Sequence, residues 1–165
     1  MIKTKAEIVA GSILSYRIYE SPVGKLLLAG DVNGLQRIQF ERNIEVDKNW
    51  QESQEVFNQT TQQLDEYFAK TRKTFDLKLN PQGTTFQKQV WKRLEKIPFG
   101  QTKTYGQIAQ EIGNSKASRA IGMANSKNPI PIIIPCHRVI GKNGSLTGFA
   151  GGLDVKQQLL SLENK

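Results

Sequence analysis

The stretch from residue 128 to residue 139 reads NPIPIIIPCHRV and is the most informative part of the chain. It holds the only cysteine and the only histidine among 165 residues, Cys136 and His137. Its three prolines exclude a helix, because each removes a backbone donor and disfavours helical geometry in the residue before it. Residues 130–134 are too apolar to lie in water. We therefore predict a buried, extended segment that ends at the cysteine.

The adjacent thiol and imidazole are a candidate reactive pair. A cysteine reacts as its thiolate, which a neighbouring base or cation favours. The alternative is structural, because free cysteine is among the most buried residue types. The pair alone leaves both interpretations open. One cysteine excludes an internal disulfide, and one cysteine with one histidine cannot supply the four ligands of a structural zinc site, so no metal is expected. We also expect no cofactor.

Before this stretch, the sequence predicts two short helices with a Gly-Asn turn between them. Thr104 and Gln107 match a capping box, Gly113 is a natural stop, and Ser115 can cap the second helix. The inner face of that second helix contains Ala117, Ala120, Ile121 and Ala124. Its outer side carries Lys116, Ser118 and Arg119. This pattern is typical of a helix-turn-helix, although plain helical hairpins share it.

Beyond the stretch, residues 148–152 read GFAGG. The glycines allow either close approach of the backbone to a ligand or a simple linker. A last helix is predicted from about Leu153 to Glu163. Farther upstream, Thr84 or Thr85 can cap another amphipathic helix.

The first half of the chain predicts a small α+β unit. Alternating apolar residues predict strands at residues 15–19 and 35–40, and the apolar run at residues 25–29 predicts another between them. Asn33-Gly34 is a strong hairpin signal between the last two. An amphipathic helix is predicted over residues 52–69, and residues 74–79 alternate again. This half contains no catalytic constellation.

Charge divides the chain near the breakers at residues 80–83. Residues 1–82 carry 11 basic and 11 acidic side chains, whereas residues 83–165 carry 12 basic and 4 acidic ones, the whole net charge of +8. A basic half of this kind indicates a polyanion partner, or a charged surface that only aids solubility. We predict one domain over residues 1–82 and a second over residues 83–165.

The sequence also bears on the compartment. The N-terminus lacks the apolar run of a signal peptide, and no stretch approaches the roughly 18 apolar residues of a membrane span. An unpaired thiol is most at ease in the reducing cytosol. We therefore expect a cytoplasmic protein without a membrane partner.

The stretch beginning at Asn128 resembles the active-site signature of the O6-alkylguanine-DNA alkyltransferases, also called methylated-DNA–protein-cysteine methyltransferases. The resemblance runs through residues 97–100 and 104–106 to residues 151–153 and Glu163. It implies an α+β fold with an RNase H-like N-terminal domain and a mainly helical C-terminal domain that contains a helix-turn-helix. It further implies a single-use repair protein that flips O6-alkylguanine, or O4-alkylthymine, out of double-stranded DNA and keeps the alkyl group.

The resemblance implies a role for each residue of the reactive centre. Cys136 would accept the alkyl group, and His137 would act as its base through a water. Glu163 would hold the imidazole in the useful tautomer, as the third member of a triad does. Asn128 would fasten the cysteine segment to the helix pair.

Other implied roles concern the DNA and the base. Tyr105 would donate to guanine N3, and Arg119 would fill the space left by the flipped base. Backbone groups at Cys136, Val139 and Ala150 would read the edge of the base. Further substrate or DNA contacts are expected from Lys116, Ser118, Arg138, Phe149 and Gly151. Phe149 stands where many members of the family have tyrosine.

Three other functions compete with this one. Alkyltransferase-like proteins bind alkylated DNA but usually carry tryptophan at the acceptor position, which Cys136 argues against. A helix-turn-helix regulator could use a structural or sensing cysteine, and a thiol hydrolase also pairs cysteine with histidine. For the repair protein we expect a monomer, and cooperative binding along DNA is left open.

Overall fold

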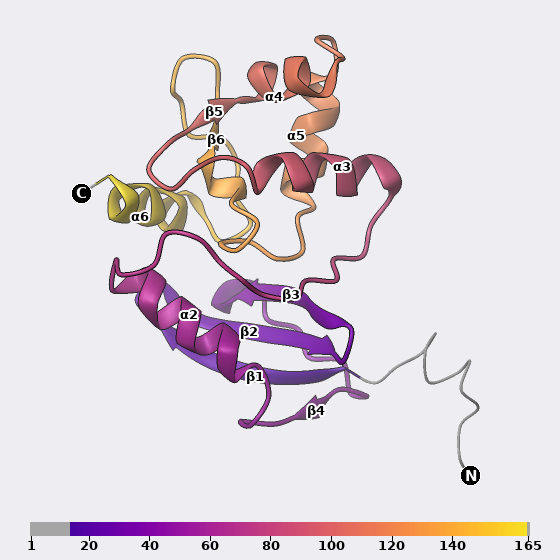
Figure 1. Ribbon diagram of the computed structural model, residues 1–165, viewed down its shortest axis with the longest axis vertical. Coiled ribbons are helices and arrows are strands. Elements are labelled where there is room, and N and C mark those ends of the chain that lie inside the picture. The colour runs from indigo at the N-terminus through magenta and orange to yellow at the C-terminus, as the bar shows by residue number, and fades with distance from the viewer. Residues whose placement is uncertain (1–13, 165) are drawn as a thin grey trace.

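The computed structural model describes residues 14–164, in which a sheet with one helix lies on one side of a group of helices (Figure 1). The strands β1 (Ser15–Ser21), β2 (Gly24–Asp31) and β3 (Gly34–Phe40) form an antiparallel meander. The short β4 (Gln51–Glu52) runs parallel to β1, so the strand order is β3-β2-β1-β4. The three strands predicted for this half are confirmed.

The turns of this meander follow from glycines that accept positive φ. Gly24 has φ 104° and Gly34 has φ 129°, a region that L-residues with a side chain rarely adopt. Ser21 Oγ closes the first turn by donating to the Gly24 carbonyl at 2.6 Å. In the second turn Asp31 Oδ1 accepts from the Asn33 backbone at 2.8 Å.

Successive side chains of β2 point to opposite faces of the sheet. Leu26 and Leu28 belong to the main core together with α2 (Asn58–Phe68), which lies across that face (Figure 1). Leu27 and Ala29 lie in a smaller cluster on the opposite face. All four side chains are fully buried, and β2 is one of the two inner strands of the sheet.

The helix α2 is shorter than predicted, because it begins at Asn58 and not near residue 52. The backbone before it bonds to the sheet: Gln51 donates to the Leu14 carbonyl and Ser53 to that of Tyr16, both at 2.9 Å. Periodicity cannot reveal such a partner from another part of the chain.

Residues 74–79 do not form the strand that their alternation suggested. Only an isolated bridge joins Leu79 to Leu35 at the edge of β3. Instead, the side chain of Gln63 on α2 forms two hydrogen bonds with the backbone of Asp76. It accepts from the Asp76 N–H at 2.9 Å and donates to the Asp76 carbonyl at 3.0 Å.

The second half consists of short helices with two small strands. Its elements are α3 (Thr85–Leu94), β5 (Lys103–Thr104), α4 (Tyr105–Ile112), α5 (Ser118–Ser126), the 3-10 helix η2 (Cys136–Arg138), β6 (Val139–Ile140) and α6 (Leu153–Glu163). A further 3-10 helix, η1 (Glu41–Asn43), follows β3. Thr84 and Thr104 each form a complete capping box with the glutamine three residues on, as predicted for Thr104. Within residues 14–164 no helix is long and apolar enough to cross a membrane.

Two predictions for α5 are wrong. Its N-cap is Ala117 and not Ser115, because Asn114 organises the turn by accepting from the backbones of Lys116 and Ala117. Ala120 is exposed, since the buried stripe is centred on Ile121 and Ala124 and leaves Ala120 at its border. The stripe packs against α3, where Trp91 Nε1 donates to the Ala124 carbonyl at 2.9 Å.

Candidate active site

The apolar stretch before Cys136 is buried, as predicted, but it is not extended. The Ile134 N–H donates to the Ile130 carbonyl at 2.9 Å, which closes a tight turn. Ile132, at the centre of the turn, has φ 76°. A β-branched residue is strained in this region, so the surrounding core must hold it there. The turn also meets the sheet, because the Ile38 N–H of β3 donates to the Pro129 carbonyl at 2.9 Å.

Asn128 fastens this turn with both ends of its amide. Its Nδ2 donates to the Ile134 carbonyl at 2.7 Å, and its Oδ1 accepts from the Ile130 N–H at 3.0 Å. Its own backbone N–H reaches the Asn125 carbonyl in the last turn of α5 at 3.3 Å. Asn128 therefore contacts the cysteine segment through its side chain and the second helix of the pair through its backbone.

Cys136 and His137 open η2, and both are buried. His137 Nε2 lies 2.7 Å from Glu163 Oε2 at the end of α6, whereas His137 Nδ1 has no hydrogen-bond partner among the described residues. Burial lowers the pKa of His137, and the opposing pull of Glu163 does not reverse that shift. The imidazole is therefore neutral near pH 7, and the carboxylate fixes the proton on Nε2 and leaves Nδ1 as an acceptor.

The Glu163 carboxylate is the most heavily hydrogen-bonded group of the site. Arg138 Nε donates to Oε1 at 2.8 Å and Arg138 Nη2 to Oε2 at 2.9 Å, a two-pronged contact. Tyr67 on α2 donates to Oε2 at 2.6 Å. Burial alone would raise the pKa of Glu163, but hydrogen bonds from His137 and Arg138 hold it well below its ordinary range. The group is an anion, and it orients His137.

Arg138 is not placed for the DNA contact that was predicted for it. Its side chain is buried, and a third nitrogen, Nη1, donates to the Ile97 carbonyl at 2.7 Å. An arginine whose donors are occupied inside the protein balances the buried carboxylate and does not reach phosphate.

Thr147 connects Tyr105 with a buried lysine beside the cysteine. β5 pairs in parallel with β6, so the start of α4 lies next to the residues that follow η2. The Tyr105 hydroxyl is hydrogen-bonded to Thr147 Oγ1. Lys156, fully buried on α6, donates to the Val139 carbonyl at 2.7 Å and to the Thr147 carbonyl at 3.4 Å.

The thiol is protonated at rest. Burial raises the pKa of Cys136 to about 11, although a hydrogen bond from Asn128 and the charge of Lys156 lower it in part. Formation of the thiolate at neutral pH therefore requires a base, and His137 is adjacent. Lys156 adds a cation whose field favours the anion.

The glycine loop, residues 148–152, packs against the N-terminal half, a contact that the sequence did not predict. Phe149 contacts Phe40, with ring centroids 5.3 Å apart, and the Ala150 carbonyl accepts from Asn43 Nδ2 at 2.7 Å. Gly151 is buried, and a Cβ there would come within 2.8 Å of the Phe40 ring. Gly151 is thus required for close packing, and the predicted contact of this residue with DNA is not supported.

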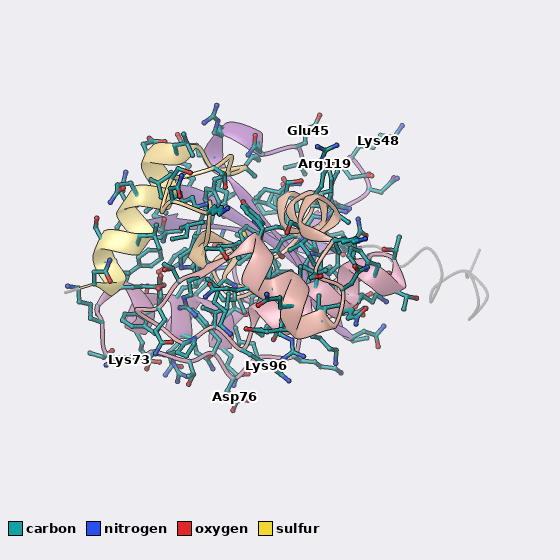
Figure 2. The ribbon with its side chains drawn as sticks, turned by 90° about the horizontal axis from the view of Figure 1, so that it is seen from above. Glu45, Lys48, Lys73, Asp76, Lys96 and Arg119 are labelled. Carbon is teal, nitrogen blue, oxygen red and sulfur yellow. The ribbon has the colours of Figure 1, made fainter. Side chains whose placement is uncertain are left out.

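The outer side of α5 is basic and exposed. Arg119 extends outward from α5 (Figure 2), and Lys116 is exposed just before the helix. Ser118 is half-buried and lines a surface hollow with Tyr105, at the start of α4, and Lys142, in the turn after β6. These polar and cationic groups form one face beside the cysteine segment.

Sequence reasoning missed Tyr67 and Lys156 as members of the site. Tyr67 lies in the amphipathic helix predicted over residues 52–69, and a buried tyrosine hydroxyl needs a hydrogen-bond partner. Lys156 falls within the inward spacing of Val155 and Leu159 on α6. A lysine at an inward position was the available signal.

The unfolding free energy is expected to decline as the pH falls below about 6.5. A lowered pKa in the folded state means that His137 contributes stability above its unfolded pKa and loses it as the pH falls, and Glu163 does the same at lower pH. Cys136, whose pKa is raised, loses its contribution only as the pH rises toward 11. Urea midpoints across the pH range measure this, and a flat midpoint between about pH 7 and pH 5 would contradict it.

Within residues 14–164 no cluster of three or more histidine, cysteine, aspartate or glutamate side chains could hold a metal ion. The fold and site define an α+β protein with a buried Cys-His-Glu centre and a helix pair, α4 and α5, that carries the exposed cations Lys116 and Arg119. Comparison with known families agrees. The ribonuclease-like domain of 6-O-methylguanine DNA methyltransferase matches residues 14–81, and the DNA binding domain of the same family matches residues 85–165.

Individual relatives agree over nearly the whole chain. The methylated-DNA–protein-cysteine methyltransferase of Methanosarcina acetivorans is 57% identical over 151 residues, which cover 90% of this chain and 97% of the relative. The crystal structure of Mycobacterium tuberculosis OGT in complex with DNA is 45% identical and superimposes with a TM-score of 0.87, covering 91% of this chain and 92% of the other. This chain belongs to the O6-methylguanine DNA methyltransferase family.

Proposed function

We propose that this protein repairs DNA by moving the alkyl group from O6 of guanine to Cys136 Sγ, where it stays. The observation that carries the proposal is the geometry around His137. The neutral imidazole is held through Nε2 by an ionised Glu163, and its Nδ1 is free to accept a proton. The adjacent residue is Cys136, the single cysteine of the chain.

The chemistry is an in-line displacement. The thiol proton passes to His137 Nδ1 through a water, and sulfur attacks the alkyl carbon as the bond to O6 breaks. Guanine leaves as an anion, and Tyr105 favours its departure by donating to N3. The net change exchanges a proton for the alkyl group on guanine. Because no step releases the sulfur, each molecule acts once.

The lesion must leave the base stack to reach Cys136. Extrusion of a base costs a few kcal/mol, and a guanidinium at the vacated place offsets part of that cost. We assign this to Arg119, which α5 presents outward, and assign phosphate contacts to Lys116 and Ser118. In this proposal α4 and α5 act as the helix-turn-helix of a C-terminal domain over residues 83–165.

The base would be read by backbone groups. The Ala150 carbonyl already accepts from Asn43, but a carbonyl has a second lone pair for the exocyclic amine of guanine. Val139 and Cys136 supply the other backbone groups, and Phe149 forms part of the wall. O4-alkylthymine offers a similar alkyl oxygen and is proposed as a second substrate. We place the activity in the cytoplasm, on double-stranded DNA, with the protein acting as a monomer.

The mass of the intact protein tests the proposal. After incubation with duplex DNA carrying one O6-methylguanine, the protein should gain the mass of one methyl group in place of a hydrogen, and peptide mapping should place it on Cys136. Plain guanine should be restored in equal amount. Turnover beyond one lesion per protein, or methyl on another residue, would overturn the proposal.

Arg119→Ala is expected to slow repair in duplex DNA by about 10-fold or more while reaction with free O6-benzylguanine changes little. Removal of a stacking and phosphate-neutralising group makes extrusion of the base less favourable, and an effect of about 1.4 kcal/mol is tenfold. Single-turnover rates on the two substrates measure this. Lys73→Ala is the matched control, because that cation lies beside Phe99. Equal losses on both substrates would remove Arg119 from this role.

A further inference from the structure

The hydroxyl of Tyr67 reaches the reactive centre from the other half of the chain. It lies on α2 and donates to Glu163 Oε2 at 2.6 Å across 96 residues of sequence. The same oxygen binds His137 Nε2 at 2.7 Å. Both Tyr67 and Glu163 are buried, so water does not compete for this contact.

We propose that Tyr67 is a positioning residue of the reactive site, whose hydroxyl sets how strongly Glu163 holds and polarises His137. The inference rests on the function proposed above and deepens it, because it makes the N-terminal half part of the reactive network. Tyr67 touches neither the thiol nor the substrate. It acts through Glu163 alone.

The physical basis is competition for one oxygen. Oε2 accepts from Tyr67, His137 and Arg138 Nη2, whereas Oε1 accepts from Arg138 Nε and from the Gly100 N–H at 3.3 Å. Each hydrogen bond to a carboxylate stabilises its anionic form. With one donor removed, Oε2 carries more charge for His137, and the imidazolium becomes more favourable.

Other charged and titratable groups around His137 act alongside this contact. Arg138, on the same 3-10 helix, and Lys156, on α6, both disfavour a cation at His137. The neutral Cys136 thiol is the adjacent residue. Burial, followed by the charge of Glu163, raises the pKa of Tyr67 far above its ordinary value, so its hydroxyl remains a donor throughout the working pH range.

The ring of Tyr67 has a separate, structural role. It contacts Phe68, Phe75 and Phe99 with centroid distances of 5.1, 5.5 and 5.9 Å. Tyr67→Phe keeps this packing and removes the hydroxyl only. Tyr19→Phe is the matched control, since the Tyr19 hydroxyl donates to Asp65 Oδ1 on the same helix at 2.5 Å.

The single histidine makes the test direct, because every imidazole signal in a nitrogen-15 NMR spectrum belongs to His137. The wild type should show the tautomer with its proton on Nε2. Tyr67→Phe should raise the midpoint of the His137 titration by about 0.5 pH unit, and Tyr19→Phe should leave it in place. The single-turnover rate on O6-methylguanine DNA falls at acidic pH, because His137 must be neutral to accept the thiol proton. The midpoint of that fall should shift to higher pH by the same amount.

A stronger donor at the same position should act in the opposite direction. 3,5-Difluorotyrosine placed at residue 67 keeps the ring and should lower the midpoint, and it decides the matter if Tyr67→Phe does not fold. An unchanged His137 titration with the fluorinated residue would overturn the inference. A wild-type protein that transfers no methyl group would instead overturn the proposed function, because the titration is read without substrate.

Discussion

Replacement of Cys136 by serine is expected to abolish alkyl transfer, with a loss of about 10³-fold or more, while binding to alkylated DNA is retained. A hydroxyl ionises far less readily than a thiol, and its oxygen is the weaker nucleophile in an in-line displacement. His137, neutral and held by Glu163, is too weak a base to compensate. Single-turnover transfer of a labelled methyl group measures the loss, and an electrophoretic shift assay measures binding.

The two readouts together separate a chemical effect from a structural one. Serine is close to cysteine in size, so the turn that Asn128 fastens should persist. Ser145→Ala, in the exposed turn after β6, is the matched control and should transfer at the wild-type rate. Transfer by Cys136→Ser at a comparable rate would mean that another residue accepts the alkyl group.

Arg138→Met is expected to lower the unfolding free energy by about 3–5 kcal/mol. Methionine fills a similar volume, but it leaves the buried Glu163 carboxylate without its only two-pronged partner and the Ile97 carbonyl without a donor. Urea unfolding at neutral pH measures the loss. Arg72→Met removes an arginine–carboxylate contact at the surface, with Glu66, and should leave the midpoint almost unchanged.

The double variant Arg138→Met, Glu163→Gln sharpens this prediction. Neutralising the carboxylate removes the unpaired charge, so the double variant should be more stable than Arg138→Met alone. Tyr67 and His137 still find a partner in the glutamine amide. If the double variant is instead the less stable of the two, the cost of Arg138→Met comes from packing and not from a stranded charge.

Sequence reasoning succeeded where the cause is local. Alternation, the apolar run at residues 25–29 and the Asn33-Gly34 turn were enough to predict the three strands, and the capping box at Thr104 was enough to predict the start of α4. The adjacent Cys136 and His137 were recognisable as a reactive pair because their chemistry is a property of the residues themselves. Asn128 and Glu163 came only from the resemblance to a family.

Sequence reasoning failed where a distant partner decides the conformation. Ile132 adopts positive φ because the turn is held by Asn128 and by the edge of β3, which overcomes the local preference of isoleucine for extended backbone. Arg138 is buried because Glu163 lies beside it, and nothing in its neighbours in sequence signals that pairing. From charge composition alone, Arg138 is indistinguishable from a cation at the surface.

The contact between Tyr67 and Glu163 also sets an order of events during synthesis. Contacts between residues so far apart form slowly, because the intervening chain must be ordered first. The ribosome synthesises α2 before α6. In the same way, the Ile38 N–H of β3 is synthesised before its acceptor, the Pro129 carbonyl. Cys136 therefore enters its reactive surroundings only after α6 has been synthesised. Under the proposed function the thiol is consumed in a single reaction, so this order would protect it until α6 has been made.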